Sequence, residues 1–279
     1  MRAKSYAKIN LALDVLKKLE NGYHEVRFVM QTITLCDDIT VCAAEEISVN
    51  SNLPFIPRDS KNIAFRAARE FFDYTGIGGG ASIYLDKKIP VGAGLGGGSS
   101  NGATVISALN DIYDARLTLP EMEGIAAKTG SDTAFFLTGG TCLAEGLGEV
   151  ITPVTAAPKG WVLVYKPQFS ISTKWVYENL NLDESTYHPD VDAVINAIKS
   201  GDIRSMAQST GNTLERTVQK KYPQITQTKE TIIKNGALGA IMSGSGSAVF
   251  GIFDSEATAR RCAAKLKKPY DICGVYEFI

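Results

Sequence analysis

The chain has 279 residues, of which 44% are hydrophobic and 21% charged, and its net charge is −1. This balance is typical of a soluble globular protein with one large domain or two ordinary ones. The lysine pairs are scattered, and no basic stripe argues for nucleic acid as a partner. No apolar run is long enough to cross a bilayer, and the N-terminus lacks the pattern of a signal peptide.

The cysteine and histidine content argues against disulfides and zinc. Five cysteines are spread along the chain without a C-x-x-C pair, which suits buried thiols in a reducing cytosol. We therefore expect a cytoplasmic protein. With two histidines and no H-E-x-x-H, a catalytic zinc site is not expected, and the sequence alone selects no metal ligands.

The first 50 residues predict antiparallel β-structure. Apolar and polar residues alternate over 5–15, Asn21-Gly22 is a turn signal, and the stretches 26–35 and 39–43 continue the sheet. Lys8 and Asn10 point to the same face of the first strand. Lys8 is either an edge lysine that discourages aggregation or, together with Asn10, part of a cleft.

A strand, a glycine-rich loop and a helix follow one another in the middle of the chain. A helix is expected over 62–74, ended by the glycine run at 76–80, and a strand is expected over 81–85. The segment 90–101, PVGAGLGGGSSN, then leads into an amphipathic helix. Glycines allow close approach of backbone N–H groups, and a helix start adds unpaired donors and positive dipole charge. This combination predicts an anion site, with phosphate as its usual occupant.

Other glycine motifs fit this loop less well. Gly92, Gly94 and Gly97 satisfy the dinucleotide spacing G-x-G-x-x-G, but no acidic residue ends a following strand. A Walker A loop needs a lysine after its last glycine, and none is present. The glycine loop of protein kinases is followed by a strand, whereas a helix is predicted here.

The stretch beyond the loop contains a possible catalytic carboxylate. Thr118 and Glu121 have the spacing of a capping box and predict a helix over 118–129. Asp132 follows, and taken alone it is the N-cap of a short turn. The stretch 153–160 is the best linker in the chain, so we expect an N-terminal domain over 1–155 and a C-terminal domain over 156–279.

The C-terminal part predicts an α+β domain. The turn Ser243–Ser247, with sequence SGSGS, is either a flexible hairpin or a second source of backbone donors for the phosphate loop. Ser172 or Thr173 can cap a short helix through Tyr177. Strands are expected over 161–165, 238–242, 248–253 and 274–278, and helices over 190–199, 202–209, 212–220, 223–235 and 255–266.

Three motifs together resemble the GHMP small-molecule kinases. The segment 90–101 resembles their phosphate-binding motif, Ala7–Leu11 their first motif, and Ser243–Phe250 their third. All three occur in family order over nearly the whole chain. The resemblance implies an ATP-dependent small-molecule kinase with an α+β fold of two domains. The N-terminal domain would be like ribosomal protein S5 domain 2, and the C-terminal domain ferredoxin-like.

Further segments, at 21–25, 30–33, 130–132, 139–141 and 172–177, resemble one branch of this family. That resemblance implies phosphorylation of the 2-hydroxyl of a cytidine diphosphate-linked methylerythritol, on the non-mevalonate route to isoprenoid precursors. The alternatives are another GHMP kinase, acting on homoserine, mevalonate or a sugar, and a non-catalytic nucleotide-binding paralogue. Thr133-Ala134, Leu147 and Gly102 depart from the expected pattern, and none of them removes a catalytic group.

The resemblance also assigns residue roles. It implies that Asp132 takes the proton of the substrate hydroxyl and that Lys8 keeps Asp132 ionised. Mg²⁺ is expected with the ATP. Ser99 or Ser100 would offer hydroxyls to the phosphates or the Mg²⁺. The residues expected to hold ATP are Pro90, Gly92, Gly94, Leu95, Gly96, Gly97, Gly98, Ser99 and Ser100.

The expected substrate site includes two aromatic side chains. Tyr23 would stack on the cytosine, and His24 would distinguish it by hydrogen bonding. Phe169 would supply a second aromatic wall. Asn10 would contact the substrate near its reacting end, and Thr173 belongs to the same predicted site.

Overall fold

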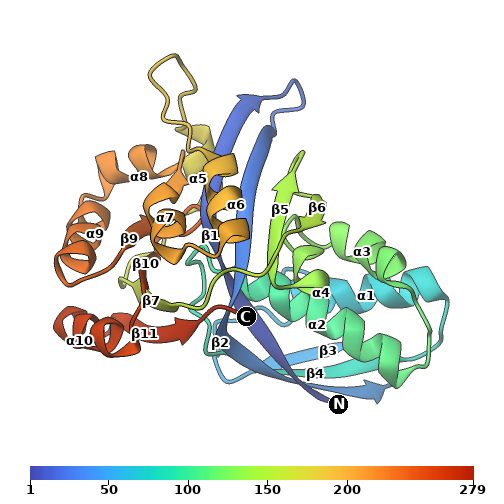
Figure 1. Ribbon diagram of the computed structural model, residues 1–279. Coiled ribbons are helices and arrows are strands. Elements are labelled where there is room, and N and C mark those ends of the chain that lie inside the picture. The colour runs from blue at the N-terminus through green and yellow to red at the C-terminus, as the bar shows by residue number, and fades with distance from the viewer. The chain divides into compact units, whose positions relative to one another are not determined.

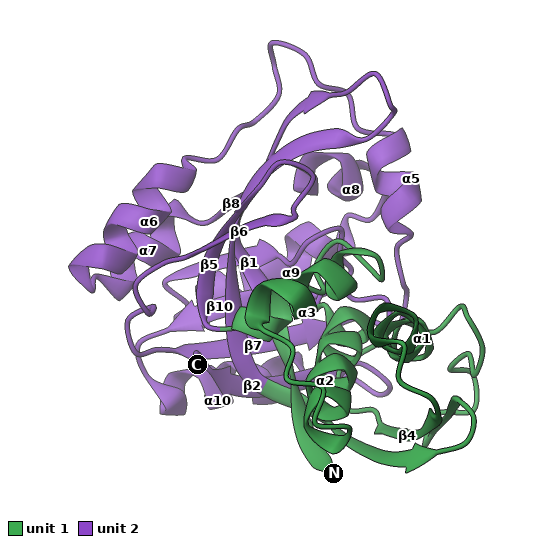
Figure 2. Cartoon of the chain, turned by 90° about the vertical axis from the view of Figure 1, so that its right-hand side faces the viewer, with its two compact units in different colours: residues 1–7, 35–91, 96–139 green, residues 8–34, 92–95, 140–279 purple.

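The computed structural model describes residues 1–279, which form two compact units (Figure 2). Unit 1 comprises residues 1–7, 35–91 and 96–139, and unit 2 comprises residues 8–34, 92–95 and 140–279. Two long strands, β1 (Arg2–Lys18) and β2 (His24–Ala44), contribute residues to both units. The predicted division at 155/156 follows the order of the chain and remains a prediction.

The strands of unit 1 are its parts of β1 and β2 together with β3 (Ser48–Ser51) and β4 (Gly80–Asp86) (Figure 1). Strand β3 runs parallel to β4, and β4 runs antiparallel to β2. Strand β2 is continuous where the sequence predicted two strands, 26–35 and 39–43. The residues between these two stretches include Asp37, which is fully buried and whose carboxylate accepts hydrogen bonds inside the unit.

Four helices complete unit 1, and side-chain caps define the first of them. The Asn62 side chain accepts from the N–H of Ala64, and Gly76 ends the helix in the left-handed conformation at φ 67°. Thr118 and Glu121 form the predicted capping box at another helix. The helices are α1 (Ile63–Thr75), α2 (Gly97–Ile112), α3 (Leu119–Ala127) and α4 (Phe135–Thr138).

Gly102 allows helices α1 and α2 to pack closely. A Cβ atom at this position would lie 2.8 Å from Cγ2 of Ile63, which is shorter than real side-chain contacts. The departure from the family pattern at Gly102 therefore has a packing reason in this chain. The Ile63 side chain occupies the space that the methyl group of an alanine at position 102 would need.

The parts of β1 and β2 in unit 2 are joined by a turn in which Leu19 N–H donates to the Tyr23 carbonyl and Gly22 N–H donates to the Leu19 carbonyl. The sheet continues with the antiparallel strands β5 (Thr141–Glu145) and β6 (Val150–Pro153). A two-residue strand that the sequence did not predict, β8 (Gly211–Asn212), runs parallel to β1.

A second sheet of unit 2 has four antiparallel strands in the order β11-β7-β10-β9. These strands are β7 (Trp161–Lys166), β9 (Gly239–Met242), β10 (Val249–Phe253) and β11 (Ile272–Glu277). With α10 (Glu256–Leu266) and the helices between β7 and β9, they give the β-α-β-β-α-β order of a ferredoxin-like fold. The intervening helices are α5 (Thr173–Glu178), α6 (Val191–Ser200), α7 (Ile203–Ser209), α8 (Glu215–Lys221) and α9 (Gln224–Lys234).

The predicted α+β character of this part of the chain is confirmed, and each predicted helix and strand is present. The helix predicted from 212 begins only at Glu215, because Asn212 belongs to β8. Strand β10 is buried along its whole length, with Phe250 and Phe253 among the largest fully buried side chains. Its apolar side chains form the centre of the core of this sheet. No helix of the protein has both the length and the apolar composition that a membrane crossing requires.

Candidate active site

The first part of the glycine loop, Gly92–Leu95, belongs to unit 2 and packs against the SGSGS turn. Gly94 has a positive φ of 77°, and a Cβ atom there would lie 2.0 Å from the Ser243 carbonyl oxygen. The Ser243 hydroxyl donates to the Gly94 carbonyl at 3.0 Å, and Ala248 N–H donates to the Ala93 carbonyl at 3.2 Å. Of the two alternatives for Ser243–Ser247, the structure supports the one in which this turn meets the phosphate loop.

The second part of the loop, from Gly96 onward, belongs to unit 1 and begins α2. Gly96 is the N-cap in the left-handed conformation at φ 71°, and no side chain caps the helix. The helix starts at Gly97, two residues earlier than Ser99-Ser100, so the last glycines form its first turn. The N–H groups of that turn have no side-chain acceptor, and they lie at the positive end of the helix dipole. This geometry is suited to a phosphate.

The two serines of the loop differ in their surroundings. Ser100 is only 2% exposed, and its hydroxyl accepts a hydrogen bond from the Ser5 hydroxyl at 2.7 Å. Ser99 is half-buried. Because the Ser100 hydroxyl is held in the interior of unit 1, Ser99 is the better candidate to meet a bound phosphate.

Asp132 lies in a turn between α3 and α4, within the same unit as α2. The turn passes beside the first turn of the helix, since a Cβ atom on Gly130 would lie 3.6 Å from the Ser99 hydroxyl oxygen. Asp132 is half-buried and accepts from the Ser131 hydroxyl at 3.3 Å. Helix α4 begins at Phe135 and its N-cap is Ala134, so Asp132 does not cap this helix.

Lys8 and Asn10 point to one face of β1 in unit 2, as the alternation predicted. Lys8 is 4% exposed, its Nζ donates to Asn10 Oδ1 at 2.7 Å, and its N–H donates to the Leu95 carbonyl at 3.0 Å. The edge-lysine alternative is wrong, because the Lys8 side chain is buried and not presented to solvent at a sheet edge. Lys8 is tied through its backbone to the glycine loop.

The aromatic residues of the expected substrate site have different ring neighbours. Tyr23 is 65% exposed at the turn, and the His24 ring lies 5.1 Å from the ring of Tyr177 on α5, at an interplanar angle of 43°. The ring of Phe169 instead stacks on Tyr222 at 5.0 Å. Tyr177, which lies at the end of the segment 172–177, is therefore a further candidate that no motif marks as a binding residue.

Two polar features complete this region. Burial, and secondarily the positive charge of Lys18, lower the pKa of His24, which favours the neutral imidazole at neutral pH. The Thr173 hydroxyl hydrogen-bonds the Ser245 hydroxyl at 2.7 Å. This bond links the start of α5 to the turn that holds the glycine loop.

The side chains offer no ready-made metal cage. No group of three or more His, Cys, Asp or Glu side chains lies close enough together to hold a metal ion. Mg²⁺ in phosphoryl-transfer sites takes much of its coordination from the phosphates and water. The chain therefore fits a metal that arrives with the nucleotide better than one held by protein ligands alone.

Comparison with known proteins agrees with this arrangement. Residues 62–140 match the model of the GHMP kinase N-terminal domain, and residues 194–272 match that of the GHMP kinase C-terminal domain. The protein is thus an ATP-dependent small-molecule kinase of the GHMP class, with the two-domain α+β fold of that class. Solved structures of a homoserine kinase from Cytophaga hutchinsonii (18% identity, TM-score 0.78, covering 99% of this chain and 95% of that one) and of L. major mevalonate kinase (16%, 0.77, 100% and 95%) share the fold.

Closer relatives define the branch. The chain is 44% identical to 4-diphosphocytidyl-2-C-methyl-D-erythritol kinase of Lachnoclostridium phytofermentans, covering 95% of this chain and 91% of that one. It is 45% identical to the enzyme of the same name from Geobacillus kaustophilus, covering 92% and 90%. A crystal structure of 4-(cytidine 5'-diphospho)-2C-methyl-D-erythritol kinase superposes with a TM-score of 0.85 at 31% identity, over 100% of this chain and 99% of that one. The chain belongs to the 4-diphosphocytidyl-2-C-methyl-D-erythritol kinase family.

Proposed function

We propose that this protein transfers the γ-phosphoryl group of ATP to the 2-hydroxyl of 4-diphosphocytidyl-2-C-methyl-D-erythritol, on the non-mevalonate route to isoprenoid precursors. Relatives that carry this activity in their names are over 40% identical along nearly the full chain. The observation that carries the chemistry is the placement of the Asp132 turn beside Ser99 at the start of α2. A carboxylate and an uncapped helix start are the parts that a hydroxyl kinase needs.

Phosphoryl transfer depends mainly on positioning and on neutralising charge. The N–H groups of Gly97, Gly98 and Ser99 would bind the phosphate oxygens, and the Ser99 hydroxyl would add a further donor. Mg²⁺ bound with ATP would neutralise part of the phosphate charge. Binding of the phosphates along the helix axis would fix the γ-phosphorus for attack.

Asp132 would act as the general base. An alcohol is a weak nucleophile at neutral pH, and a carboxylate in hydrogen-bond reach takes its proton as the new P–O bond forms. Lys8 would keep Asp132 ionised and stabilise the developing negative charge. The hydrogen bond from Lys8 Nζ to Asn10 Oδ1 fixes the direction of the ammonium group. Asn10 would also contact the substrate near its reacting hydroxyl.

The cytidylyl end would be held by Tyr23, His24 and Tyr177. A neutral imidazole has one donor and one acceptor nitrogen, which matches the mixed donor and acceptor edge of cytosine. The rings of Tyr23 and Tyr177 would offer faces on which the base can stack. Thr173, which is bonded to Ser245, would place α5 and hence Tyr177 against the substrate.

The direct test is Asp132→Asn, with Asp111→Asn at the exposed end of α2 as the matched control. General-base loss should lower kcat by about 10²-fold or more, and the control should retain wild-type turnover. ATP consumption would be measured with the cytidylyl methylerythritol, homoserine and mevalonate. Turnover of Asp132→Asn within a few-fold of wild type, with the fold intact, would contradict the base assignment. Preference for homoserine or mevalonate would contradict the substrate.

A double variant tests whether Lys8 and Asp132 act together. Residues that serve one step are strongly non-additive, so Lys8→Met combined with Asp132→Asn should cost about as much kcat as the worse single variant. Losses that multiply would mean that the two groups act independently. Circular dichroism and urea unfolding of each variant would exclude loss of fold as the cause.

A further inference from the structure

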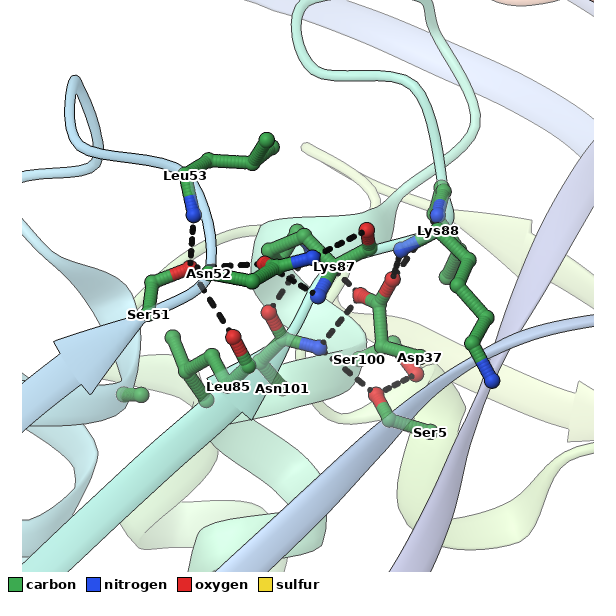
Figure 3. Close-up of polar contacts among 12 residues, drawn as sticks. Ser5, Asp37, Ser51, Asn52, Leu53, Leu85, Lys87, Lys88, Ser100 and Asn101 are labelled. Atoms are coloured by element: carbon green, nitrogen blue, oxygen red, sulfur yellow. Dashed lines mark hydrogen bonds and ion pairs between the residues drawn. The ribbon is translucent and has the colours of Figure 1, made fainter.

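A network of buried polar side chains in unit 1 joins the two ends of the glycine loop (Figure 3). Its centre is Asp37 on β2, whose side chain is fully buried. The Asp37 Oδ1 atom accepts the N–H groups of Lys88 at 2.7 Å and Ile89 at 2.8 Å. These two residues immediately precede Pro90, where the loop begins. One oxygen of the carboxylate therefore fixes the chain as it enters the loop.

The other oxygen fixes the chain as it leaves. Asp37 Oδ2 accepts from Asn101 Nδ2 at 2.8 Å and from the Lys87 ammonium group (Figure 3). Asn101 is 2% exposed and follows the first turn of α2. A single carboxylate thus holds backbone donors before the loop and a side-chain amide after it. The phosphate-binding segment lies between these two attachment points, Ile89 and Asn101.

The network extends from Asn101 to the first turn itself. Asn101 Oδ1 accepts from Lys87 Nζ at 2.9 Å, and Asn101 Nδ2 donates to the Ser5 hydroxyl at 2.9 Å. The Ser5 hydroxyl in turn donates to the Ser100 hydroxyl at 2.7 Å. All of these groups are buried, and Lys87 is 9% exposed. A buried ion pair of this kind is strongly disrupted when one partner is removed, because the other charge is left uncompensated.

We propose that Asp37 is a positioning residue for nucleotide binding. Helix α2 has no side-chain cap, and its first N–H groups are left for the ligand. The helix start must therefore be held from its inner side, and the bonds from Asp37 and Ser5 to Asn101 and Ser100 do this. Phosphate donors must stay within about 0.5 Å of their productive positions, so loosening this clamp lowers nucleotide affinity before it affects the other substrate.

The inference rests on the proposed phosphate-binding role of the loop, and ADP binding tests it without any reference to the second substrate. In Asp37→Asn, the carboxamide cannot accept from all four donors, and Lys87 loses its counter-charge. We expect the Kd for ADP, measured by isothermal titration calorimetry, to rise at least tenfold. The KM for the cytidylyl substrate should stay within threefold. Asp38→Asn is the matched control, because this neighbouring carboxylate is 44% exposed and should leave ADP binding unchanged.

Exchanging the two side chains should partly restore ADP binding. Asp37→Asn combined with Asn101→Asp returns a carboxylate to Lys87 and gives the new amide at position 37 an acceptor. We expect the double variant to bind ADP at least threefold more tightly than Asp37→Asn. An ADP Kd for Asp37→Asn within twofold of wild type would overturn the proposal. An equal rise in the Kd for ADP and in the KM for the cytidylyl substrate, as a general loosening of the fold would give, would overturn it as well.

If Asp37→Asn does not fold, the milder variant Ser5→Ala tests the same proposal. Ser5→Ala removes one hydroxyl from the network and should raise the ADP Kd about threefold, with no change in the KM of the second substrate; no change in ADP affinity would overturn the proposal. Wild-type protein that binds no ADP would contradict both the loop assignment and this inference. Wild-type protein that binds ADP without phosphorylating the cytidylyl alcohol would contradict only the proposed substrate assignment.

Discussion

The ring of His24 lies 5.1 Å from the ring of Tyr177, which brings the first residue of β2 beside helix α5. We predict that Tyr177→Ala raises the KM for the cytidylyl substrate about tenfold, because stacking of an aromatic ring on a base contributes ~1–3 kcal/mol. The KM for ATP should change by less than twofold. Steady-state kinetics with each substrate varied in turn would measure both values.

Two further variants separate stacking from packing. Tyr177→Phe keeps the ring and should behave like wild type. Phe169→Leu should leave the KM for the cytidylyl substrate unchanged, because the Phe169 ring stacks on Tyr222. If Phe169→Leu raised this KM and Tyr177→Ala did not, the original assignment of Phe169 as the second wall would be the correct one.

The lowered pKa of His24 predicts the pH dependence of substrate binding. Burial, followed by the charge of Lys18, moves the pKa below its ordinary value of 6.5, so His24 is neutral at pH 7. The KM for the cytidylyl substrate should change little above about pH 7 and show most of its rise below pH 6.5. His24→Gln should remove this rise. His188→Gln, which alters the other histidine, should preserve it.

The same shift fixes the sign of its effect on stability. Between the lowered pKa and 6.5, the unfolded state binds more protons at this residue than the native state does. His24 therefore makes the free energy of unfolding increase with pH across that interval and has no effect above it. Urea unfolding of His24→Gln at several pH values would measure this contribution as a difference from wild type. A KM that completes most of its rise above pH 6.5 would contradict the lowered pKa.

Local signals predicted most helices and strands, because their causes are local. The cap at Asn62, the capping box at Thr118 and the turn at Asn21-Gly22 each depend on residues within a few positions of one another. Strand β8 could not be found in this way. Its two residues carry no alternating pattern, and its pairing with Leu13 joins positions nearly 200 residues apart. The continuity of β2 across residues 36–38 could not be predicted either, because the donors that satisfy the buried Asp37 lie about 50 residues further along the chain.

In the candidate site, too, local motifs were predictable from the sequence and long-range contacts were not. Motifs predicted the glycine loop and supplied Lys8 and Asp132 as candidates, whereas no motif distinguishes Phe169 from Tyr177 as an aromatic candidate. Both aromatics flank Thr173 in sequence, and only the packing of α5 against the start of β2 places one of them beside His24. The sequence could not show that the Ser100 hydroxyl points inward, since this depends on Ser5, which lies 95 residues earlier in the chain.

Asn212, on the strand that the sequence missed, supports the SGSGS turn. Its Nδ2 donates to the carbonyls of Met242 at 2.9 Å and Gly244 at 2.8 Å, and the side chain is 2% exposed. We predict that Asn212→Asp, which loses both donors, raises the KM for ATP about tenfold and lowers the free energy of unfolding by about 2 kcal/mol. Kinetics and urea unfolding would check this. Asn50→Asp, on an exposed position of β3, is the control.

The last prediction concerns Thr133, next to Asp132. Its side chain is fully buried, and its hydroxyl has no hydrogen-bond partner. Valine has nearly the same shape without the polar atom, so Thr133→Val should raise the free energy of unfolding by about 1 kcal/mol. The kcat should not change, because no step assigned to Asp132 uses this hydroxyl. Urea unfolding would measure the stability, with the exposed Thr155→Val as a control expected to shift it by less than about 0.5 kcal/mol. A loss of stability in Thr133→Val would mean that the hydroxyl is bonded in solution, and a fall in kcat would give it a part in holding Asp132.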